Sequence, residues 1–212
     1  MHCPLCASSS RQLFYQDQRR CYLRCGRCRL VYVPPAYHLD AAAERAEYDL
    51  HQNDVHDPGY RRFLSRLAVP LLKRLPAAAS GLDFGCGPGP ALAHMLREAG
   101  CGVSLYDIFY YPDDARLQVG YDFICATEVV EHLHRPGQVL AQLWDLLHPG
   151  GWLGVMTKLV RDQDAFAGWH YKNDPTHVVF FSRETWRWWG RQVGAQPEFP
   201  GADVILLQKP GA

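Results

Sequence analysis

Three glycines at alternate positions follow an apolar segment near the middle of the chain. The run Leu82-Asp83-Phe84-Gly85-Cys86-Gly87-Pro88-Gly89 is typical of a strand that enters a tight turn, and residues 91–99 behind it favour a helix. Glycine tolerates positive φ and lets the backbone approach a ligand closely, while the following helix offers unpaired N–H groups. This strand-turn-helix unit predicts a binding site for a nucleotide-like cofactor.

A second acid, Asp107, ends the apolar segment 102–107 and lies 20 residues after Gly87. In nucleotide-binding folds a carboxylate near this spacing accepts hydrogen bonds from the ribose hydroxyls. The glycine spacing is G-x-G-x-G, and Pro90 occupies the position of the third glycine in a dinucleotide fingerprint. The spacing therefore disfavours NAD.

At these residues the chain resembles the class I S-adenosylmethionine-dependent methyltransferases, whose first motif is an acid and a small apolar residue before G-x-G-x-G. Residues 121–126 match the fourth strand of that family, and residues 147–153 match the turn into its fifth strand. An ordered set of motifs over residues 80–209 is more specific than one glycine loop. The resemblance implies S-adenosylmethionine as the cofactor. The residues that would bind it are Asp83, Gly85, Cys86, Gly87, Gly89, Asp107 and Thr127.

A second group of candidate residues lies in the segment Thr127-Glu128-Val129-Val130-Glu131-His132. If this segment begins a helix, Glu128, Glu131 and His132 occupy positions i, i+3 and i+4 and share one face. Because the carboxyl ends of parallel strands border the ligand crevice, we expect this face to point toward the transferable methyl group. His177, in a later segment, would complete the group.

Two carboxylates and an imidazole suit a divalent ion, which could lower the pKa of a substrate hydroxyl and orient it. The pattern E-x-x-E-H with a later histidine resembles methyltransferases of the terminal ribose 2′-hydroxyl of small RNAs and O-methyltransferases of the ubiquinone pathway. That resemblance implies that Mg²⁺ or Mn²⁺ binds at Glu128, Glu131, His132 and His177. Two alternatives stay open: a metal-free general base at His132 or His177, and a capping or packing role. Glu128, His132 and His177 are the candidate catalytic residues.

Five of the eight cysteines lie before residue 30. The pairs Cys3-x-x-Cys6 and Cys25-x-x-Cys28 are separated by 18 residues, a spacing at which two knuckles place four thiolates around one tetrahedral zinc. Short strands around residues 14–15 and 20–23 would join the knuckles. A module this small needs the metal because its own apolar core is inadequate. We therefore expect a structural zinc ribbon.

The rest of the chain alternates between strand and helix patterns, which indicates a parallel sheet. Strands are expected at 81–85, 102–107, 121–126 and 152–157, helices at 89–99 and 136–147, and an antiparallel hairpin near the end. Only 13 residues separate Asp107 from Tyr121, so the third strand of the family is expected to be truncated or absent. The predicted fold class is α/β, with a doubly wound, mostly parallel, Rossmann-like sheet.

Three regions are expected along the 212 residues: a zinc ribbon at 1–33, a helical linker or cap at 34–78, and the S-adenosylmethionine-binding domain at 79–212. In the cap, one helix is expected over 41–50, followed by the polar stretch 51–54. A second helix is expected from Pro58, with Asp57 as its N-cap, to Pro76.

Neither an apolar run of about 18 residues nor a secretory signal pattern is evident, so we expect a cytoplasmic protein without membrane contact. The expected activity is methylation of a hydroxyl on a small molecule or sugar. The loop 166–173, which contains Trp169, His170 and Tyr171, is either a lid over the acceptor or an anchor packed on the surface.

Two other functions remain open. The formal net charge is zero, but residues 3–30 carry six arginines and one aspartate. With Phe14, Tyr15 and Tyr22, such a ribbon could bind RNA through phosphate contacts and base stacking, and the layout is similar to ribosomal-RNA methyltransferases with an N-terminal zinc knuckle. The other alternative is a non-catalytic adaptor whose ribbon recruits a partner, although the intact glycine loop argues against it.

Overall fold

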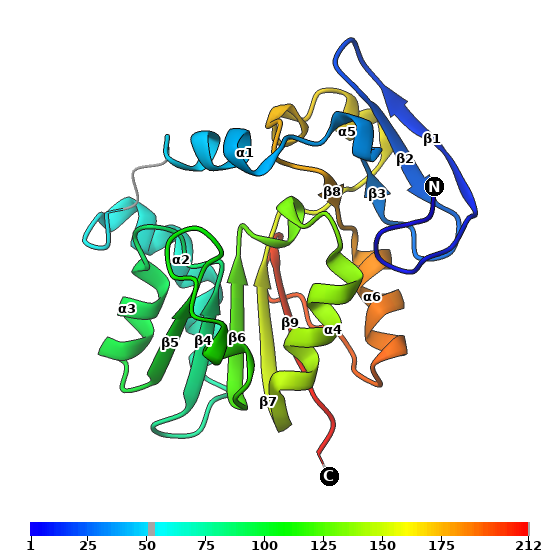
Figure 1. Ribbon diagram of the computed structural model, residues 1–212. Helices are drawn as coiled ribbons and strands as arrows, with labels where there is room; N and C mark the ends of the chain where they lie inside the picture. The colour runs from blue at the N-terminus through cyan, green and yellow to red at the C-terminus, as the bar shows by residue number, and fades with distance from the viewer. Residues whose placement is uncertain (51–53, 212) are drawn as a thin grey trace.

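The computed structural model of the chain describes residues 1–50 and 54–211. Residues 51–53, part of the polar stretch expected after the first helix, lie outside that description. A five-stranded sheet forms the centre of the molecule (Figure 1). In spatial order its strands are β5 (Gly102–Tyr106), β4 (Ser80–Phe84), β6 (Tyr121–Thr127), β7 (Leu147–Met156) and β9 (Val204–Gln208).

Four strands of this sheet are parallel, and β9 runs antiparallel to β7. The strand positions expected from the sequence are confirmed to within a few residues at most ends, although β7 begins at Leu147. Between β5 and β6 the chain forms no strand, only a short 3-10 helix, η2 (Asp114–Leu117). The third strand is thus absent, and β5 is an edge strand. The closing hairpin is present as a single bridge between Glu198 and Leu206.

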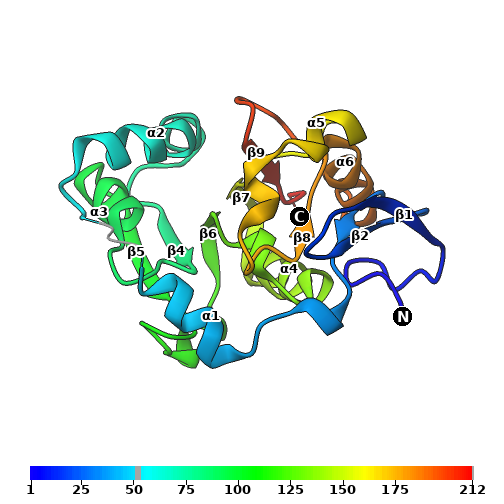
Figure 2. The ribbon, with the colours of Figure 1, turned by 90° about the horizontal axis from the view of Figure 1, so that it is seen from above.

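Helices cover both faces of the central sheet (Figure 2). Side chains alternate along β6, where Phe123 and Cys125 join one apolar cluster and Ile124 and Ala126 join the other. The first face is covered by α2 (Pro58–Leu72) and α3 (Ala91–Glu98). The second is covered by α4 (Pro136–Leu146) and α6 (Arg183–Gln192). The doubly wound α/β architecture expected from the sequence is therefore confirmed.

The cap helices differ slightly from expectation. The helix α2 begins as predicted, because the Asp57 carboxylate accepts a hydrogen bond from the Tyr60 N–H at 2.5 Å, but it ends at Leu72. The shorter α1 (Ala41–Tyr48) has no buried side chain and lies beyond the ends of the parallel strands (Figure 1). Within the described residues, no helix is both long enough and apolar enough to span a membrane.

The N-terminal region folds into a small antiparallel sheet of β1 (Arg11–Gln16), β2 (Cys21–Cys25) and β3 (Val31–Tyr32). A fourth strand, β8 (Val179–Phe180), pairs with β3 and comes from the far end of the chain. The ribbon sheet is therefore completed by residues that lie between β7 and β9 of the central sheet in the chain. One continuous apolar cluster joins the ribbon to the second face of the central sheet.

The remaining described elements are short and lie on the ribbon side. They are η1 (Pro35–Tyr37), η3 (Val130–His132), α5 (Gln163–Ala167) and η4 (His170–Asn173).

Candidate active site and metal centres

The glycine loop lies where the strand order of the sheet reverses. After β4 the chain continues to β5 on one side, whereas β6 and β7 lie on the other side. Open α/β sheets bind ligands at such a switch point, outside the carboxyl ends of the strands. Gly85 and Gly87 have φ of 70° and 64°, the left-handed region that glycine adopts freely. A Cβ on Gly85 would lie 2.5 Å from a methyl group of Val129, so the loop packs directly against the segment after β6.

Asp107 connects the glycine loop to the chain beyond β5. Its side chain is nearly buried, and Oδ2 accepts a hydrogen bond from the Gly87 N–H at 3.0 Å. Oδ1 accepts from the N–H groups of Phe109 at 2.8 Å and Tyr110 at 3.1 Å. A carboxylate has about four acceptor positions, so this arrangement fixes the loop and still leaves capacity for ligand hydroxyls. Its role toward a ribose stays a prediction.

Asp83 lies buried beneath the same loop, and its Oδ1 has no hydrogen-bond partner among the described residues. Burial raises the pKa of Asp83 to about 7. Unpaired buried oxygens are rare in proteins, and one beside a binding loop fits a group that a ligand completes. The other predicted cofactor residues lie in or near the loop. Cys86 is buried in the loop, and the Gly89 carbonyl accepts a hydrogen bond from the Ala91 N–H at 2.8 Å. Thr127 is the last residue of β6 and pairs with Met156 of β7.

The segment after β6 does not form the expected helix. Glu128 has a φ of 52°, which is uncommon outside glycine, and only residues 130–132 form a single 3-10 turn. The prediction of a shared helical face was therefore wrong. The ligand atoms of Glu131, His132 and His177 nevertheless converge, all within 4.8 Å of one another. Glu128 is not part of that group.

Tyr171 joins the two glutamates. Its hydroxyl donates to Glu131 Oε1, and it lies 3.4 Å from Glu128 Oε2 and 3.2 Å from Thr157 Oγ1. The second oxygens, Glu128 Oε1 and Glu131 Oε2, are buried without a hydrogen-bond partner among the described residues. Burial raises the pKa of Glu128 to about 8, helped by repulsion from Glu131, and raises the pKa of Glu131 to about 7. Glu131 is fully buried and Glu128 half-buried, and both lie at the same tyrosine hydroxyl, so the pair is favoured with at least one carboxyl neutral or with a cation beside it.

His177 is held in the orientation typical of a metal-binding histidine. Its Nδ1 lies 2.7 Å from the Tyr171 carbonyl oxygen, so Nδ1 carries the proton and donates it. The Nε2 atom, which lies 3.7 Å from Asp174 Oδ2, then carries the lone pair and can act as an acceptor or a metal ligand. Burial lowers the pKa of His177, which favours the neutral imidazole that metals bind. The His132 ring lies 4.6 Å away, centroid to centroid.

The unpaired carboxylate oxygen of Glu131 and the oriented imidazole of His177 fit a divalent cation. A mixed set of oxygen and nitrogen donors suits Mn²⁺ better than Mg²⁺, which prefers oxygen ligands. The helix α1 borders this group. The ring centroids of Tyr48 and His132 are 5.3 Å apart, and Glu44 Oε1 lies 2.7 Å from His134 Nε2.

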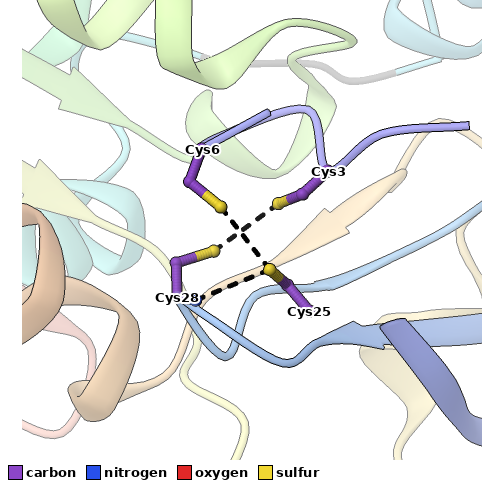
Figure 3. A group of neighbouring side chains, drawn as sticks. All are labelled: Cys3, Cys6, Cys25 and Cys28. Atoms are coloured by element: carbon purple, nitrogen blue, oxygen red, sulfur yellow. Dashed lines mark hydrogen bonds between the residues drawn. The ribbon is translucent and has the colours of Figure 1, made fainter. Parts of the chain in front are cut away.

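Four thiols converge in the ribbon as the sequence predicts (Figure 3). Cys3 and Cys28 are 3.5 Å apart at sulfur, as are Cys6 and Cys25, and all four sulfurs lie within 4.8 Å of one another. Zn–S bonds of about 2.3 Å in a tetrahedron give sulfur separations of roughly 3.8 Å, so the donor set fits zinc. The same separations exclude disulfides, whose sulfurs are about 2.05 Å apart.

Both cysteine pairs have the same backbone shape. The residue after the second cysteine has a positive φ in each pair, 57° at Ala7 and 65° at Arg29. Backbone N–H groups of Arg27 and Cys28 point to the Cys25 sulfur at 3.4 and 3.5 Å. A positive φ at two non-glycine residues is costly, and metal coordination by the four cysteines would offset that cost.

The aromatic loop is an anchor. The Trp169 ring packs on Phe166 and Phe180 at 5.8 and 6.0 Å, and Tyr171 is buried. Of its ring-bearing residues, Trp169 is half-buried and His170 is exposed, with Nε2 2.9 Å from Lys158 Nζ. The hydrogen bonds of Tyr171 were not expected, because sequence patterns do not show which glutamate a tyrosine hydroxyl will meet. The signal that existed was the turn-forming run Asp174-Pro175-Thr176, which directs the chain into His177.

A family model described as a methyltransferase domain matches residues 56–198, which is more than half of the chain. The chain belongs to that methyltransferase family. The methyltransferase is 28% identical over 198 residues to the biotin biosynthesis bifunctional protein BioCD of Bordetella avium. The match covers 83% of this chain and 38% of BioCD, so the chain spans well under half the length of that relative.

Solved structures show the same fold. The 1,6-didemethyltoxoflavin-N1-methyltransferase of Burkholderia thailandensis, solved with 1,6-didemethyltoxoflavin and S-adenosylhomocysteine, has a TM-score of 0.50 and 18% identity. That match covers 95% of this chain and all of the Burkholderia chain. An O-methyltransferase family protein of the same species has a TM-score of 0.50 and 14% identity, covering 80% of this chain and 63% of the other. At these identities the likeness concerns the fold alone.

Proposed function

We propose that the protein is an S-adenosylmethionine-dependent methyltransferase that binds its cofactor across the carboxyl ends of β4 and β5. The observation that carries the proposal is the hydrogen bond from the Gly87 N–H to Asp107, which joins the two predicted cofactor contacts at the switch point of the sheet. The residues proposed to hold the cofactor are Asp83, Gly85, Cys86, Gly87, Gly89, Asp107 and Thr127. Family membership and the fold support this proposal.

The reaction would be an in-line displacement at the methyl group of the sulfonium. Because the sulfonium already activates the methyl group, the protein needs mainly to hold the acceptor in line and to remove its proton. Val129 packs on Gly85, so the segment that carries Glu128, Glu131 and His132 begins beside the proposed cofactor loop. This proximity supports a role for that segment on the acceptor side.

We further propose that the acceptor atom is a hydroxyl oxygen and that Glu131, His132 and His177 hold a divalent cation, Mn²⁺ or Mg²⁺, beside it. Such an ion supplies a lowered pKa for a bound hydroxyl. Tyr171 donates to Glu131 and so orients that carboxylate, while Glu128 lies at the edge of the group. Without the ion, the neutral imidazole of His177 is the group best oriented to accept a proton.

A small molecule or sugar is the better supported acceptor. Of the three ribbon aromatics that would stack on RNA bases, Phe14 and Tyr22 are 3% and 1% exposed and Tyr15 is half-buried, and all three pack against Phe166. Arg20 is also buried, which removes it from any phosphate-binding surface. The named relatives, a biotin biosynthesis protein and a methyltransferase solved with 1,6-didemethyltoxoflavin, also favour a small acceptor.

Titration calorimetry with S-adenosylmethionine tests the proposed function. We expect the wild-type chain to bind the cofactor and Gly87→Ala to bind it at least about tenfold more weakly, because alanine is strained at this positive φ. The matched control is Gly102→Ala, since a Cβ at Gly102 meets no atom within 4 Å and its φ is not positive. If the wild-type chain does not bind S-adenosylmethionine, the proposal of an enzyme is contradicted and a non-catalytic adaptor is favoured.

A further inference from the structure

Hydrogen bonds join the turn between β1 and β2 to the segment that carries Tyr171 and His177. Arg20 in this turn is 7% exposed. Its Nη2 donates to the carbonyl oxygens of Lys172 at 2.5 Å and Asp174 at 2.7 Å, and its Nη1 donates to the Pro175 carbonyl at 3.2 Å. One buried guanidinium therefore binds three backbone carbonyls within four residues. The planar guanidinium suits such a set because its donors come from separate nitrogens in a fixed geometry.

Neighbouring groups reinforce this contact from both sides. The Arg20 Nε donates to the Tyr22 hydroxyl at 3.0 Å, and that hydroxyl donates to the Lys172 carbonyl at 3.1 Å. The Lys172 ammonium is itself buried and lies 2.8 Å from Asp17 Oδ2 in the same ribbon turn. The segment 172–175 is thus held by charges and hydrogen bonds that originate in the ribbon.

Both ends of that segment enter the proposed metal centre. At one end, Tyr171 donates to Glu131, and its carbonyl accepts from His177 Nδ1. At the other end, His177 leads into Val178, whose N–H donates to the Glu131 carbonyl at 2.9 Å. The Val178 carbonyl in turn accepts from the Val33 N–H of the ribbon at 2.8 Å. The ribbon and the Glu131–His132–His177 group are therefore two sides of one hydrogen-bonded structure.

We propose that Arg20 is a positioning residue: by holding the carbonyls of Lys172, Asp174 and Pro175 it sets the places of Tyr171 and His177 in the group with Glu131 and His132. The ribbon then helps to position the residues on the acceptor side of the site. The proposal rests on the proposed function for its metal readout only, because the orientation of His177 can be observed without any metal.

The test compares Arg20→Ala and Arg20→Lys with the wild-type protein. Arg11→Ala is the matched control, because Arg11 is an exposed ribbon arginine whose guanidinium donates to the carbonyl oxygens of Met1 and Ser9, away from the segment 172–175. Zinc content and thermal unfolding report the state of the ribbon. Mn²⁺ binding by electron paramagnetic resonance and ¹⁵N-histidine spectra report the site, with Glu131→Gln as the benchmark for loss of a ligand.

We expect Arg20→Ala to bind Mn²⁺ about 10- to 100-fold more weakly, the range found when a group that orients a metal ligand is removed. The His177 signal should lose its Nδ1-protonated form, because the carbonyl that holds it moves. Arg20→Lys keeps the charge but presents its donors from one nitrogen and lacks the fixed guanidinium geometry, so it should restore Mn²⁺ binding only in part. Arg11→Ala should match the wild type in every readout.

Wild-type Mn²⁺ affinity together with an unchanged His177 tautomer in Arg20→Ala would overturn the proposal. Full restoration by Arg20→Lys would also overturn it, since charge alone would then suffice. If Arg20→Ala does not fold, Arg20→Lys carries the test, with reduced Mn²⁺ affinity and an altered tautomer supporting the proposal. If the wild-type chain binds no Mn²⁺, the proposed cation site fails, and the His177 tautomer alone decides the role of Arg20.

Discussion

At the scale of single residues, Asp83 makes the stability of the protein depend on pH. Burial raises its pKa to about 7 in the folded chain, whereas an aspartate in an unfolded chain has a pKa of about 3.9. The folded state therefore holds an extra proton between these values. Its contribution to the free energy of unfolding is complete below about pH 4 and is lost as the pH rises through about 7.

The variant Asp83→Asn removes this titration. Without ligand, we expect wild-type stability to fall more than that of the variant between pH 5 and pH 8. Urea unfolding at both pH values measures the difference. Equal falls in the two proteins would show that Asp83 does not titrate in this range.

The sequence allowed the candidate site residues to be named, but it predicted their positions in the structure only in part. Gly87 and Asp107 meet as their spacing indicates, because the spacing reflects a strand-turn-helix geometry shared by nucleotide-binding folds. Glu128 could not be placed, since a left-handed backbone at a glutamate leaves no mark in sequence. Arg20 was read as part of a basic surface, and only the tertiary structure shows it buried.

At the scale of elements, the ribbon depends on its four thiols, because β3 has only two residues and its sheet is closed by β8. Structural zinc contributes its binding free energy to folding. We expect Cys28→Ser to lose bound zinc and to lower the unfolding midpoint by about 5–10 °C, which corresponds to a few kcal/mol in a chain of this size.

The matched control for this prediction is Cys21→Ser, since Cys21 lies in β2 outside the group of four. Zinc content by plasma mass spectrometry and scanning calorimetry are the measurements. A Cys28→Ser protein with a full zinc complement, or with an unchanged midpoint, would contradict a structural zinc site.

Elements with a clear pattern of apolar residues were predicted from the sequence, whereas the short elements were not. The helix α2 was located by its Asp57 cap and its apolar repeat, and β6 by its apolar run. The strand β8 was missed, because two residues show no alternation and their pairing with β3 is a contact between distant parts of the chain. The missing third strand was predicted from the short distance between Asp107 and Tyr121.

At the scale of the whole molecule, the ribbon and the central sheet share one apolar cluster. Phe166 of α5 belongs to this cluster, and its ring centroid lies 5.0 to 5.4 Å from those of Phe14, Tyr22 and Phe180. The ribbon at 1–33 therefore packs against the region at 79–212, whereas α2 of the region 34–78 packs in the other apolar cluster. The boundaries of the three regions as separate domains stay a prediction. This packing brings the ribbon to the acceptor side of the proposed site.

The central claim is that an S-adenosyl cofactor lies across the carboxyl ends of the sheet beside Gly87. A crystal structure with S-adenosylhomocysteine tests it most directly. We predict the ribose hydroxyls on Asp107, the amino acid portion over residues 85–89, and the sulfur facing the segment that begins at Glu128. A cofactor bound elsewhere, or a crevice beside Gly87 filled by protein side chains, would contradict the account.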